Sequence, residues 1–205
     1  MAGPHEQLEQ TEHAEHASHS GNKKIALLIS VLALFLAFSE TLGKSAQTKA
    51  ITDNVAANDT WSFFQAKTMR QALLATAAEQ LQVQADKETD PQVKARLEKR
   101  IEDWKKTVAR YEDEPATNEG RKQLTARARK LEASRELAMA RYHNYEFASA
   151  AFQIGIVLAS AEVITSITAL GWLSGLIGLC GLALMGLGLW EPHALDFLTH
   201  AAAAH

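Results

Sequence analysis

The chain has 205 residues, of which 47% are apolar, and it carries a formal net charge of −3. This charge excludes a basic nucleic-acid-binding surface, and the single cysteine, Cys180, excludes internal disulfides and a cysteine zinc cage. The charges are unevenly spread, because all 21 Lys and Arg residues lie between Lys23 and Arg141. Such a shift in composition indicates segments in different solvents rather than one globule.

The first segment, residues 1–22, holds four Glu and four His but almost no large apolar side chain. It cannot bury enough surface to offset its chain entropy, so we expect a disordered tail. His13, His16 and His19 recur every three residues, and imidazoles beside carboxylates can bind Zn²⁺, Ni²⁺ or Cu²⁺. Nothing in the tail would fix a coordination geometry, so we expect no metal site and no cofactor.

The next segment, residues 23–43, is predicted to be the first transmembrane helix. Ile25 to Gly43 is almost continuously apolar and reaches the roughly 20 residues that span a bilayer. Lys23, Lys24 and Lys44 bracket it, as snorkelling side chains would. A signal peptide is the alternative, but an acidic tail precedes the segment and its exit is a poor cleavage site.

Residues 44–146 are polar and helix-prone, with breaks predicted at Asp90-Pro91 and Glu114-Pro115. Apolar residues step by three and four between these breaks, and every seven residues after them. A looser seam before Pro91 runs through Met69, Leu73, Ala77 and Leu81. We expect three antiparallel helices that bury these seams, as an extramembrane helical bundle or coiled-coil hairpin.

Two further apolar runs, residues 147–170 and 172–190, predict a membrane hairpin with its turn at Gly171. Trp172 and Trp190 bound the last run, where an aromatic belt would place them, and residues 191–205 are a short tail. The fold class is therefore all-α, with three transmembrane helices and an extramembrane bundle. More Lys and Arg residues flank the spans on the bundle side, which favours a cytoplasmic bundle.

Two carboxylates fall in or beside the spans, Glu40 and Glu162. Intramembrane carboxylates are costly and often serve as proton or ion sites. Each lies fifteen residues into its span, and the spans run in opposite directions, so the two are too far apart in depth to form one pair. Glu40 is interpreted as interfacial. Glu162 is the candidate proton or ion site, although it could instead be protonated or hydrogen-bonded to a neighbour.

Small residues in the last two spans would allow close helix–helix approach. They are spaced by four and comprise Ala151, Gly155, Ala159, Gly171 and Gly175. They predict a membrane packing face, which could serve the hairpin itself or a homo-oligomer. Cys180 lies in a Gly/Leu run and is interpreted as a small buried apolar residue.

The densest aromatic cluster of the polar region lies in Asn58–Lys67. Trp61, Phe63 and Phe64 cannot all face one seam of a helix, which leaves at least one free for a partner or a lipid surface. Packing against Trp104 and Tyr111 is the alternative. The candidate interaction patch comprises Trp61, Phe63, Phe64, Gln65 and Lys67.

This stretch, with the preceding span and the Tyr145-Glu146-Phe147 entry into the second span, resembles DUF4337, an uncharacterised family of bacterial membrane proteins. The resemblance extends from about Lys23 to Trp190. It implies a similar length and span layout, but the family brings no established activity, cofactor or catalytic residue.

No catalytic constellation is present in the sequence, so we expect no enzymatic activity. The leading hypothesis is an integral membrane scaffold that contacts the bilayer, self-associates or docks a protein partner, and binds no nucleic acid. The alternative is an oligomeric ion channel or proton-coupled transporter subunit that uses Glu162.

Overall fold

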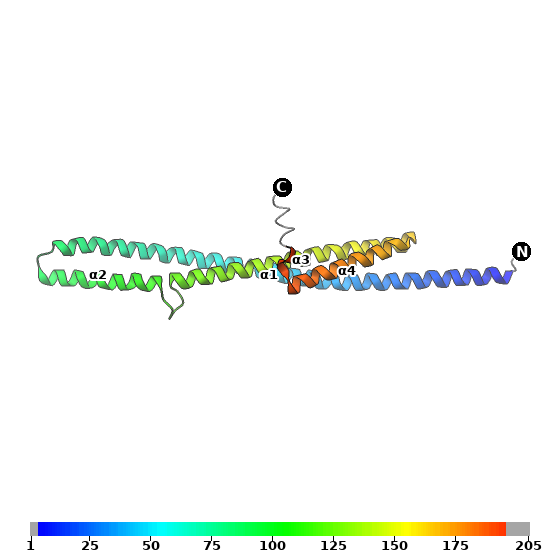
Figure 1. Cartoon of the computed structure of the whole chain (residues 1–205), viewed down its shortest axis with the longest axis horizontal. Coiled ribbons are helices and arrows are strands. Elements are labelled where there is room, and N and C mark those ends of the chain that lie inside the picture. The colour runs from blue at the N-terminus through cyan, green and yellow to red at the C-terminus, as the bar shows by residue number, and fades with distance from the viewer. Residues whose placement is uncertain (1–3, 196–205) are drawn as a thin grey trace, which may run out of the picture. The chain divides into compact units, whose positions relative to one another are not determined.

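The computed structural model describes the backbone of residues 4–195 and the side chains of residues 23–194. Its elements are α1 (Pro4–Lys87), α2 (Pro91–Glu112), α3 (Arg121–Thr165), α4 (Thr168–Trp190) and the 3₁₀ helix η1 (Pro192–Leu195) (Figure 1). The all-α prediction is confirmed. Residues 4–22 of the expected disordered tail form the start of α1, while residues 1–3 lie outside the described part of the chain.

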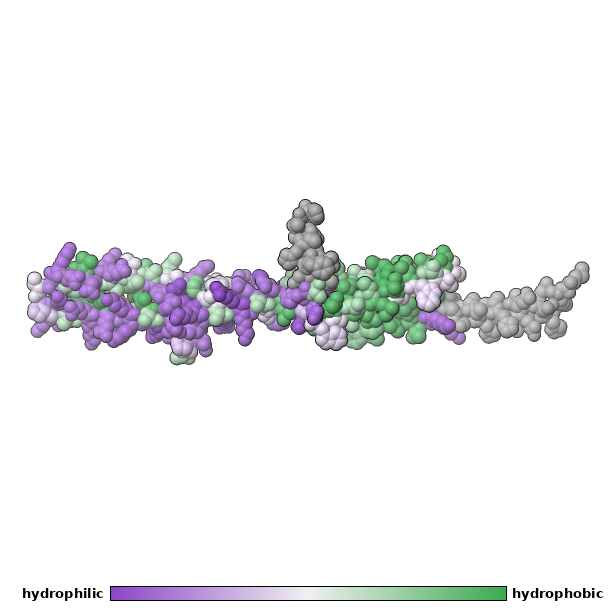
Figure 2. Space-filling view, in the orientation of Figure 1, coloured by the Kyte–Doolittle hydropathy of each residue, from purple (hydrophilic) through white to green (hydrophobic). Residues whose placement is uncertain are grey.

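The chain divides into two compact units. We call residues 1–49 with 137–205 the apolar unit, and residues 50–136 the polar unit. Figure 2 shows hydrophobic residues over the first and hydrophilic residues over much of the second. Three helices are long and apolar enough to span a membrane, as predicted, and their candidate windows lie in α1, α3 and α4.

Both predicted breaks in the polar region are confirmed, and each has a local cause. The Asp90 side chain caps α2 by accepting a hydrogen bond from the Gln92 amide at 2.8 Å, and Pro91 opens the helix. After α2 ends at Glu112, Asn118 takes a positive φ of 56° in the loop that leads to α3. Asparagine tolerates this left-handed conformation better than most residues do.

The helices of the polar unit form a two-helix arrangement rather than the expected three helices side by side. In Figure 1, α2 and then the start of α3 follow each other along α1. Ile101 of α2 packs with Ala78 and Ala85 of α1, whereas Trp61 of α1 bonds to Glu132 of α3. The lengths explain this, because residues 50–87 of α1 extend roughly 57 Å, about as far as α2 and residues 121–136 do together.

The buried face of α1 in the polar unit repeats at steps of three and four. The buried or partly buried positions that follow these steps are Ala50, Asp53, Ala57, Thr60, Phe64, Lys67, Gln71, Leu74, Ala78, Leu81 and Ala85. The predicted seam through Met69 and Leu73 is wrong, because these side chains are 69% and 65% exposed. Small alanines occupy much of the real seam because they allow the paired helices to approach closely.

The apolar unit packs α1, α3 and α4 around Leu32, Ala148 and Phe152. Phe35 and Phe152 stack with ring centroids 6.0 Å apart. Two hydroxyls join the helices: Ser39 Oγ donates to the Tyr145 carbonyl at 2.9 Å, and Ser174 Oγ donates to the Gly155 carbonyl at 2.7 Å. These hydrogen bonds pair α1 with α3 and α3 with α4.

The turn of the apolar hairpin differs from the prediction. It lies at Ser166 and Ile167, where Ser166 has a φ of 59°, and not at Gly171. Gly171 is instead inside α4, and a Cβ there would lie 1.7 Å from the Glu162 Oε2 atom. The glycine is thus explained by close approach to Glu162, a contact that its spacing in the sequence does not reveal.

Candidate functional site

Lys67 is the best-enclosed residue of the predicted interaction patch. It is buried, and its Nζ atom lies 3.1 Å from Glu114 Oε2 and donates to the Glu119 carbonyl oxygen. The Phe63 and Tyr111 rings lie 5.6 and 5.4 Å from the same ammonium. Lys67 therefore holds the loop between α2 and α3 against α1.

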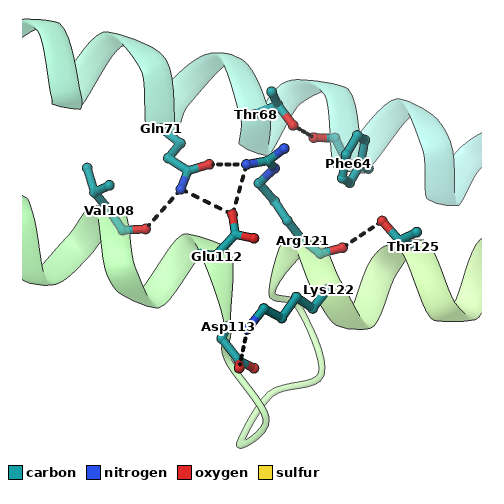
Figure 3. A network of polar contacts seen from close by, with 9 residues as sticks. All are labelled: Phe64, Thr68, Gln71, Val108, Glu112, Asp113, Arg121, Lys122 and Thr125. Carbon is teal, nitrogen blue, oxygen red and sulfur yellow. Dashed lines mark hydrogen bonds and ion pairs between the residues drawn. The ribbon is translucent and has the colours of Figure 1, made fainter.

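A second group of polar contacts fixes the same loop one turn further along α1 (Figure 3). The guanidinium of Arg121 bonds to Gln71 Oε1 at 2.7 Å and to Glu112 Oε2 at 2.8 Å. Gln71 also donates to the Val108 carbonyl, and the Phe64 ring lies 5.1 Å from the Arg121 guanidinium. The end of α2 and the start of α3 are thereby tied to one stretch of α1.

The predicted patch consequently divides into two groups. Trp61 donates to Glu132 at 2.7 Å and packs edge-on against Phe64, and Lys67 is enclosed, so these three residues are used inside the polar unit. Phe63 and Gln65 are exposed. The helix turns Trp61, Phe64 and Lys67 toward α2 and α3, so packing accounts for these three residues, and the interaction role of the patch stays a prediction.

An uncharged exposed stripe on α1 was not recognised in the sequence. Ile51 and Met69 lie eighteen residues apart, as do Val55 and Leu73, which is five turns at about 3.6 residues each. All four side chains are exposed. The complete α1 stripe comprises Ile51, Val55, Asn58, Ser62, Ala66, Met69, Leu73, Thr76, Gln80 and Val83.

This stripe contrasts with α2. Eleven of the 22 residues of α2 are charged, whereas no member of the α1 stripe is. A long exposed face without charge is unusual on a polar hairpin and is typical of a contact surface. In the sequence, the stripe could have been recognised from uncharged residues that recur every three or four positions. The pattern is weak because most of these residues are small or only weakly apolar.

Glu162 is only 9% exposed, although it lies one turn from the end of α3. Its Oε2 atom has no hydrogen-bond partner within the described residues. The carboxyl lies against the backbone of Gly171 and lines a groove between α1 and α4. Glu40 is exposed and follows Ser39, whose hydroxyl donates to the Tyr145 carbonyl. Tyr145 lies at the opposite end of the α3 span from Glu162, so the two acids do not meet.

Only some of the predicted membrane packing residues lie at a helix–helix contact. Gly155 and Ala159 are buried, and a Cβ on Gly155 would lie 3.2 Å from Leu32. Ala151 is partly buried and Gly171 contacts Glu162, but a Cβ on Gly175 would meet nothing within 4 Å. Cys180, expected to be buried, is exposed.

Sequence reasoning missed the main seam of α4. Its buried positions are Ser174, Gly178, Gly181 and Gly188. A Cβ on Gly181 would lie 2.9 Å from the Phe152 ring, and one on Gly188 would lie 2.9 Å from Tyr145. These residues are four, three and seven positions apart, whereas the prediction rested only on small residues spaced by four.

Charge in the α2–α3 loop is stabilised locally. Hydrogen bonds from Gln123, the larger cause, and from Lys122 hold the pKa of the Asp113 carboxyl below its usual range.

Within the described residues, no group of three His, Cys, Asp or Glu side chains could hold a metal ion. His13, His16 and His19 have side chains outside that part of the chain.

A polar helical hairpin, together with three helices long and apolar enough to span a membrane, defines an all-α protein with candidate membrane spans. The chain belongs to the family described as Domain of unknown function (DUF4337), whose model matches residues 21–191. This match confirms the family resemblance. No curated protein and no solved structure matches the chain.

Proposed function

We propose that the protein is a non-enzymatic membrane-anchored scaffold that self-associates through the α1 stripe. The observation that carries this proposal is the stripe itself, because its ten exposed positions are uncharged while half of α2 is charged. Copies anchored in one bilayer share an orientation and a high local concentration, which favours parallel pairing. A parallel two-fold pair would bring each residue of the stripe beside its own copy.

The location belongs to the same proposal. The three candidate spans would place the polar unit on one side of the bilayer, and the excess of Lys and Arg residues beside that unit favours the cytoplasmic side of a bacterial inner membrane. The stripe would then be available to a second copy, with an unidentified cytoplasmic protein as a further partner.

The test compares the mass of the full-length protein in detergent with that of Leu73→Glu. Leu73 is exposed within one chain, so the substitution leaves the monomer intact, whereas a pair would have to bury two adjacent carboxylates. We expect at least about a tenfold weaker association of Leu73→Glu. Lys99→Glu, on the exposed face of α2, is the matched control and should associate as the wild type does.

A strictly monomeric wild type at high protein concentration would contradict the proposal. Equal weakening by Leu73→Glu and Lys99→Glu would also contradict it, because the effect would then follow net charge rather than the stripe.

A second candidate, an ion- or proton-conducting subunit, is favoured by the unpartnered Oε2 atom of Glu162. Among the residues that line its groove, charged or hydroxyl side chains occur only at Lys24, Glu162 and Thr168, so such groups do not continue along the groove. Proteoliposome flux tests this candidate, and equal flux through wild type and Glu162→Gln would exclude it.

A further inference from the structure

One oxygen of the buried Glu162 carboxyl has no hydrogen-bond partner among the residues that the structure describes. Its Oε2 atom is shielded from solvent and accepts no hydrogen bond from the described residues. A buried carboxylate without a partner is strongly unfavourable in apolar surroundings. The same carboxyl group lines the adjoining groove, where a bound ligand could supply it with a hydrogen-bond donor.

The groove beside Glu162 has a volume of about 920 Å³. Its walls are mostly aliphatic and aromatic side chains of α1 and α4, including Leu28, Val31, Phe35, Leu176, Leu179 and Leu182. A space of this size and character suits the hydrocarbon part of an amphiphile. Its charged and hydroxyl side chains are confined to Glu162, Lys24 and Thr168, beside the Trp172 indole.

Lys24 and Glu162 lie at nearly the same depth. Leu32 of α1 contacts Gly155 of α3, which sets the register of these antiparallel helices. From that contact, Lys24 lies eight residues back along α1 and Glu162 seven residues on along α3. At about 1.5 Å per residue, the two are roughly 12 and 10 Å away in the same direction.

This depth corresponds to a membrane interface. Glu162 lies one turn before the end of α3, and the apolar run of α1 begins at Ile25, next to Lys24. Trp172, near the start of α4, is 83% exposed, as expected of an aromatic side chain at headgroup level. The groove therefore offers one negative and one positive group at headgroup level, with an apolar wall beside them.

We propose that this groove binds a zwitterionic phospholipid whose headgroup ends in a primary ammonium. The ammonium donates to Glu162, the phosphate pairs with Lys24, and an acyl chain lies along Leu28, Phe35 and Leu179. A primary ammonium has three N–H donors for the carboxylate, whereas a trimethylated ammonium has none. Glu162 therefore selects ethanolamine over choline headgroups, and this selection does not depend on self-association.

The test is native mass spectrometry of the full-length protein in detergent, with ethanolamine, choline and glycerol phospholipids that carry identical acyl chains. We expect about a tenfold preference for the ethanolamine lipid over the choline lipid. Glu162→Gln should reduce this preference to near parity. Lys24→Gln should weaken retention of both zwitterionic lipids, and Glu40→Gln, outside the groove, is the matched control.

A second measurement needs no substitution, so it holds even if Glu162→Gln fails to fold. Retention by the wild type should fall stepwise as the ethanolamine nitrogen gains one, two and three methyl groups. Equal retention across this series, which would indicate annular lipid only, overturns the proposal. A folded Glu162→Gln that keeps the wild-type preference overturns it as well.

Discussion

At the residue scale, the aromatic-rich Trp61–Lys67 stretch mainly contacts residues of its own helical hairpin. The Lys67 ammonium forms an ion pair with Glu114, donates a hydrogen bond to the Glu119 carbonyl and lies near two aromatic rings. These contacts compensate its charge although the side chain is buried. Buried ammonium groups are tolerated when such partners surround them. The Lys67 side chain therefore holds the α2–α3 loop in place.

Replacing Lys67 with Met should loosen that loop, because Glu114 would lose its ion pair and the Glu119 carbonyl its donor. Loss of such contacts typically costs about 1–3 kcal/mol, so amides of residues 113–120 should exchange roughly tenfold faster or more. Hydrogen exchange with mass spectrometry measures this. The control is Lys99→Met on the exposed face of α2, and unchanged exchange in Lys67→Met would contradict the assigned role.

The Asp113 carboxyl predicts a pH response of the same loop. Its pKa is lowered in the folded protein by Gln123 and Lys122, so its stabilising contribution is present above the unfolded pKa and is lost as pH falls through the folded pKa. Gln123→Leu should return the pKa of Asp113 toward its ordinary range, as a carboxyl NMR titration would show. An unchanged titration would mean that Gln123 is not the main cause.

At the element scale, α4 approaches its neighbours through glycine and serine rather than through large apolar side chains. Its buried face is Ser174, Gly178, Gly181 and Gly188, while Trp172 and Leu176 point outward. Small residues at such an interface let helix backbones approach closely, which is how helices associate when the surrounding lipid is equally apolar.

Two identical substitutions in α4 test this packing. Gly181→Ala places a Cβ 2.9 Å from the fully buried Phe152 ring, whereas Gly175→Ala enters open space. Alanine also favours a helix by about 1 kcal/mol over glycine. We expect Gly181→Ala to lower the melting temperature in detergent and Gly175→Ala to keep or raise it. The reverse order would contradict the assigned seam.

At the scale of the whole molecule, strong sequence signals predicted the architecture. Continuous apolar runs predicted the three long apolar helices, and Pro91 and Pro115 predicted the breaks, because these patterns reflect local chemistry. The end-to-end order of α2 and α3 along α1 was missed, since it depends on matching helix lengths. The turn at Ser166 was missed because Gly171 is a stronger local turn signal.

The candidate sites were predicted less well, for a related reason. Glu162 was found from its charge alone, but its groove depends on which faces of α1 and α4 come together. The α1 stripe was overlooked because large apolar residues such as Met69 and Leu73 were expected in the core. Ala78 and Ala85 occupy the core instead, since close helix packing favours small side chains there.

Cysteine crosslinking in native membranes tests self-association most directly. In a background with Cys180→Ser, Leu73→Cys should form an inter-copy disulfide on mild oxidation, because a parallel two-fold pair brings Leu73 beside its own copy. Lys99→Cys, on the charged α2 face, should remain uncrosslinked. The central claim would be contradicted if Leu73→Cys crosslinked no more than Lys99→Cys.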